Sequence, residues 1–129
     1  MRFLSTENVL RLHAQSIEEF GGASGLRDRG MLESAVSMPQ ATFGGEFLHP
    51  DLPAMAGAYL YHLSQAHPFI DGNKRTAMAA ALVFVSLNGA EVVATDDELI
   101  ALGLGVASSE ISKDEVITRL RAMIRTLDT

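Results

Sequence analysis

The stretch His67–Arg75 (HPFIDGNKR) holds the residues whose types and spacing could do chemistry. A histidine leads, Asp71-Gly72-Asn73 forms a turn signal, and two cations stand where a long apolar segment begins. Histidine is the side chain best suited to proton transfer near neutral pH, and glycine lets backbone amides approach a ligand closely. The order of these residue types predicts a titratable base beside an anion-binding turn.

Lys74 and Arg75 strengthen this interpretation because they are the only Lys or Arg residues between Arg29 and Lys113. The start of a helix already has unpaired N–H groups and the positive end of the helix dipole. Two cations at that place are unfavourable unless an anion is bound. The alternative, two solvated surface charges, is weaker, and we predict a phosphate cradle in which Arg75 binds in bidentate fashion and Lys74 acts as a point charge.

Each residue of the turn also has an ordinary interpretation. His67 could complement the dipole at the end of the preceding helix, but its place beside the cradle favours a general base. Asp71 could cap the next helix or hold a Mg²⁺ ion that bridges phosphate oxygens, and the sequence leaves both open. Gly72 and Asn73 are common turn residues; in a cradle, Gly72 would admit the phosphate and Asn73 would add a side-chain dipole.

The hydrophobic pattern predicts an all-α domain of about six helices over residues 1–129, with no alternating strand pattern and no repeat. The expected helices cover 6–20, 31–38, 51–66, 73–87, 97–107 and 113–127. The fourth is apolar on all sides after a run of alanines, so we expect it to be the central buried helix. Residues 42–49 are the least regular part, and Phe43-Gly44-Gly45 is a candidate flap beside a site. We expect Phe3, Phe20 and Phe84 in the core, and His13 and His62 on helix faces rather than as ligands.

Composition limits the classes of function. Apolar residues make up 47% and charged residues 20% of 129 residues, and the net charge of −6 argues against direct binding of nucleic acid or of anionic membranes. Without cysteine there is no disulfide, thiolate metal site or cysteine nucleophile. The N-terminus shows no signal-peptide core and no stretch is long enough to span a bilayer, so a cytoplasmic protein is expected.

The stretch His67–Arg75 resembles the signature of the Fic superfamily, histidine-proline-phenylalanine-x-acid-glycine-asparagine-glycine-arginine. Lys74 in place of the second glycine is similar to the Doc (death-on-curing) branch. Further similar stretches are Phe20-Gly21-Gly22 with the Gly25 turn, Lys74–Ala77, Leu87–Gly89 and Gly105–Ile111. The likeness extends over nearly the whole chain and implies a single Fic-type helical domain.

The resemblance also implies a function: a toxin of a type II toxin–antitoxin system that uses ATP and Mg²⁺ to phosphorylate a threonine of elongation factor Tu. Carried over, His67 would take the hydroxyl proton and Asp71 would bind Mg²⁺. Gly72, Asn73, Lys74 and Arg75 would hold phosphates. Many Fic enzymes have a second arginine where this chain has Met78. This departure favours phosphate transfer over the alternative, transfer of AMP.

A third possibility is a non-catalytic module that binds a partner helix, although such a module has no need of a base. The resemblance further implies inhibition by a Phd-like antitoxin, whose C-terminal segment folds into a helix in a groove of the toxin. We expect that groove to involve the first helix, Arg27, Arg29 and Phe43, close to the phosphate cradle.

Overall fold

The computed structural model describes residues 1–127 and has six α-helices with short strands between them. In chain order the elements are α1 (Thr6–Phe20), α2 (Arg29–Ser37), a 3₁₀ turn (Met38–Gln40), β1 (Thr42–Phe43), β2 (Glu46–Phe47), α3 (Leu52–Ala66), α4 (Asn73–Leu87), β3 (Ala90–Val92), α5 (Asp96–Ala107), α6 (Lys113–Met123) and β4 (Ile124–Thr126). The prediction of a mainly helical domain of six helices is confirmed.

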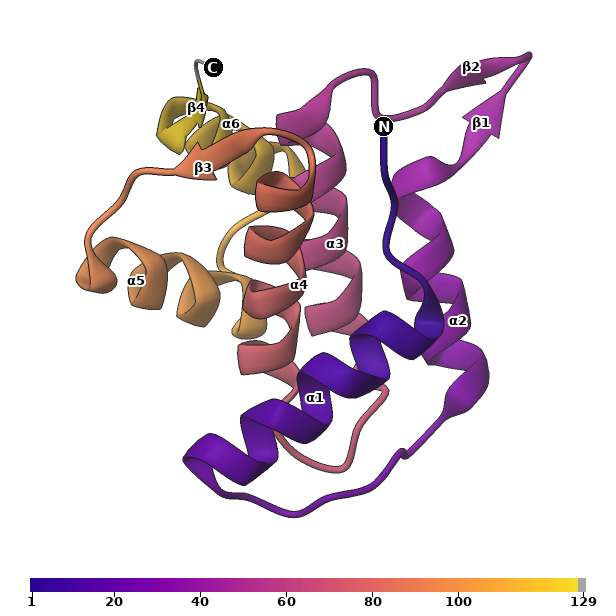
Figure 1. Ribbon diagram of the computed structural model, residues 1–129, viewed down its shortest axis with the longest axis vertical. Helices are drawn as coiled ribbons and strands as arrows, with labels where there is room; N and C mark the ends of the chain where they lie inside the picture. Colours follow the sequence, from indigo (N-terminus) through magenta and orange to yellow (C-terminus); the bar gives the residue numbers. More distant parts are fainter. Residues whose placement is uncertain (128–129) are drawn as a thin grey trace.

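Helices α3 and α4 form the centre of the molecule. They run antiparallel side by side, with α1 crossing their lower end, α2 on one flank and α5 and α6 on the other (Figure 1). The buried face of α4 has small residues at Ala77, Ala80 and Ala81, which allow the neighbouring helices to approach closely. Phe84 and Val85 are also buried, nearer to the C-terminal end of α4. The prediction that α4 is a central buried helix is confirmed, but α3 is buried to a similar degree.

Small residues and one buried phenol explain the close packing around α3. A Cβ atom at Gly57 would lie 2.6 Å from Cγ1 of Ile117, so glycine allows α6 to approach α3. Tyr59 is fully buried, and its hydroxyl accepts a 2.8 Å hydrogen bond from the Leu4 N–H. Burial raises the pKa of the Tyr59 phenol, which stays neutral and ties the N-terminal segment to the core.

Five of the six helices begin at a side chain that accepts a hydrogen bond from the first turn. These N-cap residues are Ser5, Asp28, Asp51, Thr95 and Ser112. Because the Asp28 carboxylate accepts from the Met31 N–H, α2 begins at Arg29, two residues before the predicted start. Within residues 1–127, only α4 begins without a side-chain cap.

The structure adds four short strands that the sequence pattern does not predict. Residues 42–47 form a hairpin in which β1 and β2 flank Gly44-Gly45, whose φ angles of 61° and 84° suit a tight turn. β3 pairs antiparallel with β4, and this pairing ends α6 at Met123 rather than at residue 127, because Ile124 becomes extended to pair with Val92. Strands of two or three residues are too short to show a period in sequence.

One predicted core residue lies on the surface. Phe3 and Phe84 stack at 5.8 Å between ring centroids, but Phe20 is 64% exposed at the end of α1. None of the helices in residues 1–127 combines the length and the apolarity that crossing a bilayer requires.

Candidate active site

The turn between α3 and α4 lines a cavity with a volume of about 690 Å³. Its walls come from the end of α1, the turn itself, the first residues of α4 and the end of α5. The lining residues are Phe20, Gly21, Gly22, His67, Ile70, Asp71, Gly72, Asn73, Lys74, Arg75 and Ala107. The cavity is therefore lined by all six residues that the sequence predicts for catalysis, phosphate binding and Mg²⁺ binding.

His67 is held at the rim by its backbone. It is the C-terminal cap of α3 and adopts the left-handed conformation, with φ 46° and ψ 53°. Pro68 and Phe69 are buried immediately after it, whereas the His67 side chain is exposed at the mouth of the cavity. A left-handed histidine is uncommon, and such residues are enriched at functional sites.

The floor of the cavity is the open N-terminus of α4. Gly72 is the N-cap residue with φ 78°, and it has no side chain that could accept from the first turn. The first intrahelical hydrogen bond is donated by Thr76 N–H to the Gly72 carbonyl. The amides of Asn73, Lys74 and Arg75 thus belong to the turn that an anion would satisfy.

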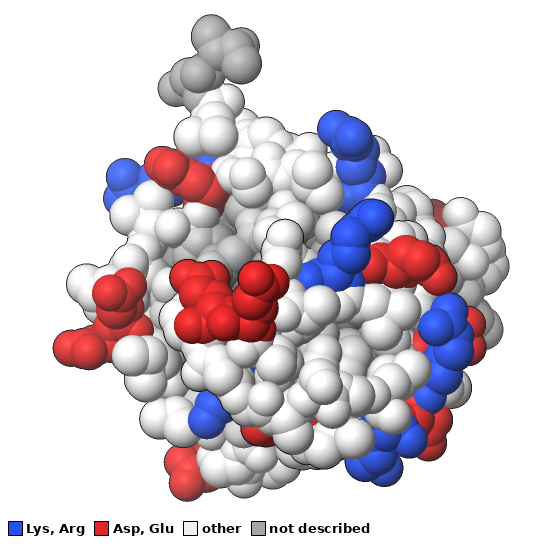
Figure 2. Space-filling model, turned by 60° about the horizontal axis from the view of Figure 1, so that its bottom comes forward, with Lys and Arg blue, Asp and Glu red and all other residues white. Residues whose placement is uncertain are grey.

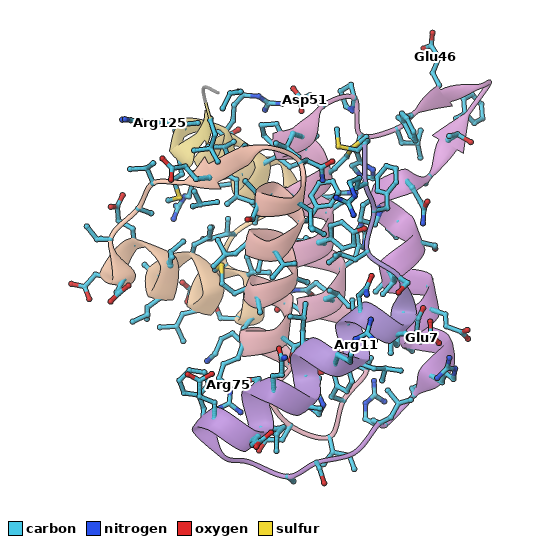
Figure 3. The ribbon with its side chains drawn as sticks, in the orientation of Figure 1. Glu7, Arg11, Glu46, Asp51, Arg75 and Arg125 are labelled. Carbon is cyan, nitrogen blue, oxygen red and sulfur yellow. The ribbon has the colours of Figure 1, made fainter. Side chains whose placement is uncertain are left out.

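The two cations lie beside this open end without a carboxylate partner within 4.0 Å in residues 1–127. Lys74 is exposed. Arg75 is half-buried; its Nη2 donates a 2.8 Å hydrogen bond to the Gly21 carbonyl, and its Cζ lies 5.7 Å from the centroid of the Phe20 ring. Figure 3 shows Arg75 at the base of α4, beside the C-terminal half of α1. Arg75 is therefore oriented by neutral groups, and the Asp71 carboxylate is close enough to interact with its charge without forming an ion pair.

Asp71 is ionised and does not cap α4. Its Oδ2 accepts from the Ala23 N–H at 3.1 Å and its Oδ1 from the Gly72 N–H at 2.8 Å. These hydrogen bonds, the one from Ala23 first, lower the pKa of the Asp71 carboxyl. The carboxylate is exposed and each oxygen has a lone pair to spare, which fits a Mg²⁺ ligand. Residues 1–127 contain no group of three or more His, Asp or Glu that could hold a metal, so Mg²⁺ here would need oxygen atoms from a phosphate ligand or water.

Asn73 has a different role from the one predicted for its side chain. Its Oδ1 accepts from the Phe69 N–H and its Nδ2 donates to the Phe69 carbonyl, both at 2.9 Å. The amide therefore closes the turn, and Asn73 has its backbone N–H and the second Nδ2 hydrogen available to a phosphate in this arrangement.

Comparisons with known proteins agree with this geometry. A family described as Fic/DOC matches residues 3–85, from the N-terminal segment to near the end of α4. The chain is 37% identical to "Protein kinase doc" of Escherichia phage P1 over 95% of this chain and 96% of that protein. It is 42% identical to "Toxin Doc" of Mycolicibacterium smegmatis (strain ATCC 700084 / mc(2)155), over 91% and 82% of the two chains.

The chain belongs to the Fic/DOC family.

Within this Fic/DOC domain, two residues near the cavity were missed by sequence reasoning. His13, expected on a helix face, is 5% exposed; its Nε2 lies 2.8 Å from the Asp71 carbonyl oxygen, and its ring stacks on Phe69 at 3.8 Å between centroids. Phe20 forms an exposed wall instead of core. The spacing of Val9, His13 and Ser16 on the buried face of α1 is the signal that could have placed His13 inside.

The residues predicted for a partner groove of the Fic/DOC domain do not form one surface. Arg27 donates to backbone carbonyls at the end of α3. Arg29 pairs with Glu7 and Glu33 at 3.3 and 3.8 Å. Phe43 is 80% exposed on the β1–β2 hairpin, which leads into the N-terminal end of α3, whereas His67 follows its C-terminal end (Figure 1). A helix of 15 residues is about 22 Å long, so the expectation that Phe43 lies beside the cradle is wrong.

The remaining histidines lie away from the cavity of the Fic/DOC domain. Burial, and then the nearby charge of Lys113, lower the pKa of His49 and lower that of His62 to about 4. Both imidazoles are therefore neutral at pH 7. Figure 2 shows the lower face of the molecule, where basic side chains lie among acidic ones and form no continuous basic surface on the side drawn.

Proposed function

We propose that this chain is an ATP-dependent phosphotransferase that acts on a protein hydroxyl group and serves as a toxin. The observation that carries the proposal is the placement of the His67 imidazole in one cavity with an uncapped helix N-terminus, Arg75 and an ionised Asp71. The names of the two relatives, one a protein kinase and the other a toxin, support it.

In the proposed reaction the hydroxyl oxygen of the target attacks the terminal phosphorus of ATP. The bond between that phosphorus and the bridging oxygen breaks, ADP leaves, and the hydroxyl proton passes to His67. The first-turn amides of α4 and the Arg75 guanidinium neutralise the phosphate charge, because both are positioned before the ligand arrives. Mg²⁺, when bound, would add further charge neutralisation, and Asp71 is the residue that would hold it.

Transfer of AMP by the same residues is the second candidate, because the cradle binds phosphates without selecting the phosphorus that is attacked. Lys74 stands where the Fic signature has glycine, and Met78 where many Fic enzymes have a second arginine. Both departures support phosphate transfer over AMP transfer. A non-catalytic module that binds a partner helix is less well supported, because it would not require a base such as His67.

A threonine of elongation factor Tu is the target that the family resemblance suggests, and translation arrest is the expected consequence. Inhibition by a Phd-like antitoxin is proposed on the same ground. The apolar cavity of about 350 Å³ between α1 and residues 24–26, lined by Leu10, Ile17, Leu26 and Phe69 among others, suits one face of an amphipathic helix. It lies closer to the motif turn than Phe43 does, since Phe69 belongs to both.

The test is a transfer assay with purified chain, Mg²⁺ and elongation factor Tu, run in parallel with ATP labelled at the α or the γ phosphate. The proposal expects the γ label on the target, a phosphothreonine by mass spectrometry, and no signal with His67→Ala. Label from the α position would establish AMP transfer instead. If neither label is transferred to this target or to any protein of a bacterial lysate, the enzyme proposal fails.

A further inference from the structure

Residues 25–28, here called the 25–28 strap, hold the turn that carries His67. Arg27 N–H and Asp28 N–H both donate to the Pro68 carbonyl, at 2.7 and 3.0 Å, and Ile70 N–H donates to the Gly25 carbonyl at 3.1 Å. Leu26 and Phe69 form an isolated antiparallel bridge at the same place. The strap therefore pairs with the motif turn along its backbone, although about 40 residues separate them in sequence.

The side chain of Arg27 extends this contact to the end of α3. Its Nε donates to the His67 carbonyl at 2.6 Å and its Nη2 to the Ala66 carbonyl at 2.9 Å. The last carbonyls of a helix have no partner within the helix, and α3 has no basic residue in its last turn to meet them. The planar guanidinium fork spans two neighbouring carbonyls, which a single ammonium group cannot do in the same geometry.

The hydrogen bonds from Arg27 matter for His67 because its exposed side chain has few contacts that would fix its orientation. Its side chain is exposed, so packing does not orient the ring, and its backbone adopts a left-handed conformation that histidine rarely takes. The direction in which the imidazole leaves the backbone is set by φ and ψ at this residue. Arg27 binds the carbonyl of the same residue, so it restrains the backbone torsion that directs the Cα–Cβ bond, from which χ1 and χ2 place the imidazole in the cavity.

We infer that Arg27 is a positioning residue for His67, and that its guanidinium fork on the Ala66 and His67 carbonyls holds the imidazole in the orientation required for proton transfer. The inference rests on the proposed function for its effect on rate, but not for its effect on the conformation of His67. It replaces the earlier assignment of Arg27 to a partner groove, because the donor atoms Nε and Nη2 are already used within the domain.

The activity test compares Arg27→Ala and Arg27→Lys with a matched control at the other end of the same helix. Arg121→Ala is that control, because Arg121 Nη2 binds the carboxylate of Asp51, the N-cap of α3, at 2.8 and 2.9 Å. We expect Arg27→Ala to lower kcat about 10- to 100-fold, the range for a misplaced catalytic group, with KM for ATP unchanged. Arg27→Lys should recover little, added guanidinium ion should restore part of kcat to Arg27→Ala only, and Arg121→Ala should retain the wild-type kcat.

A second readout does not depend on catalysis. The imidazole C–H resonances of His67, assigned by their loss in His67→Ala, should shift and broaden in Arg27→Ala and remain as in wild type in Arg121→Ala. Unchanged His67 resonances in folded Arg27→Ala overturn the inference, as does an equal loss of kcat in Arg27→Ala and Arg121→Ala. If the wild-type chain transfers no label, the proposed function fails. The His67 resonances still test whether Arg27 positions His67, because they do not depend on catalysis. If Arg27→Ala does not fold, Arg27→Lys supplies the same comparison.

Discussion

The two central helices, α3 and α4, have the same length but begin in opposite ways. Asp51 caps α3: its carboxylate accepts from the Ala54 N–H at 3.1 Å, and Arg121 in turn neutralises that carboxylate. Gly72 opens α4 with no cap, next to Lys74 and Arg75. Figure 3 places Asp51 and Arg75 at opposite ends of the molecule.

The difference separates an end that stabilises the fold from one that, in the proposed function, receives a phosphate. A capping carboxylate satisfies a first-turn amide and complements the dipole, so at α3 the protein supplies its own anion. At α4 the first-turn amides have no capping carboxylate, and two cations add further positive charge at the same end. Proteins tend to depart from favourable local interactions at functional sites, and among the α-helices of residues 1–127 the missing cap is at the helix whose N-terminus lines the cavity.

The largest expected effect tests whether the open end of α4 is a reaction site and not only a binding site. His67→Ala should lower transfer about 10²- to 10⁴-fold, the usual range for a positioned acid–base group. Nucleotide binding, followed by calorimetry, should be retained because the cradle is intact. A folded His67→Ala protein with near-normal transfer would remove His67 from the mechanism.

The second largest effect is expected from Arg75, one of the two cations at the N-terminus of α4. Arg75→Ala should weaken ATP binding and slow transfer together, by about 10- to 100-fold in kcat/KM, the range for loss of a charge-assisted hydrogen bond. Arg119→Ala is the control, since within residues 1–127 Arg119 forms its ion pair with Glu115 on α6 at 3.0 Å, away from the cavity. Equal effects of the two substitutions would mean that Arg75 acts only through overall charge.

Removing the cap of α3 should change the stability of the protein and not its activity. Asp51→Ala should lower the free energy of unfolding by about 0.5–2 kcal/mol, as measured in urea at pH 7, and leave kcat unchanged. The hydrogen bond from Arg121 is the largest cause that lowers the pKa of the Asp51 carboxyl in the folded state. Asp51 therefore stabilises the fold above its unfolded pKa of about 3.9, and loses this effect as the pH falls through its folded pKa.

The role of the Asp51 charge can also be tested by measuring stability as a function of pH. The stability gap between wild type and Asp51→Ala should be full at pH 6 and shrink as the pH falls below about 4. A gap that stays constant down to pH 2 would show that the carboxylate charge does not contribute.

The smallest expected effect concerns Lys74, an exposed point charge. Lys74→Gly restores the Fic signature and should lower phosphate transfer about two- to fivefold, the range for a surface charge near a helix end. Any activity that remains should move toward AMP transfer, which mass spectrometry of the target distinguishes. An unchanged rate and product would show that Lys74 has no part in the chemistry.

Much of the fold could be predicted from sequence because its signals are local. Caps such as Ser112 and Thr95, helix-ending glycines and apolar periodicity placed most helix ends within two residues. The strands could not be predicted, since β3 depends on a partner more than 30 residues away and has no period of its own. The placement of Phe43 beside the cradle was wrong for another reason: the length of the predicted helix over 51–66, which separates Phe43 from His67, was not taken into account.

By itself, the sequence determined the residue types of the site and the turn that presents them, because His67, Asp71, Gly72, Lys74 and Arg75 are close along the chain. Only the tertiary structure decided how the turn is held. Arg27 reaches the α3 carbonyls and His13 the Asp71 carbonyl from segments 39 or more residues away. Backbone carbonyls accept from any donor that the fold brings near, so no pattern of residue types in the motif encodes these partners.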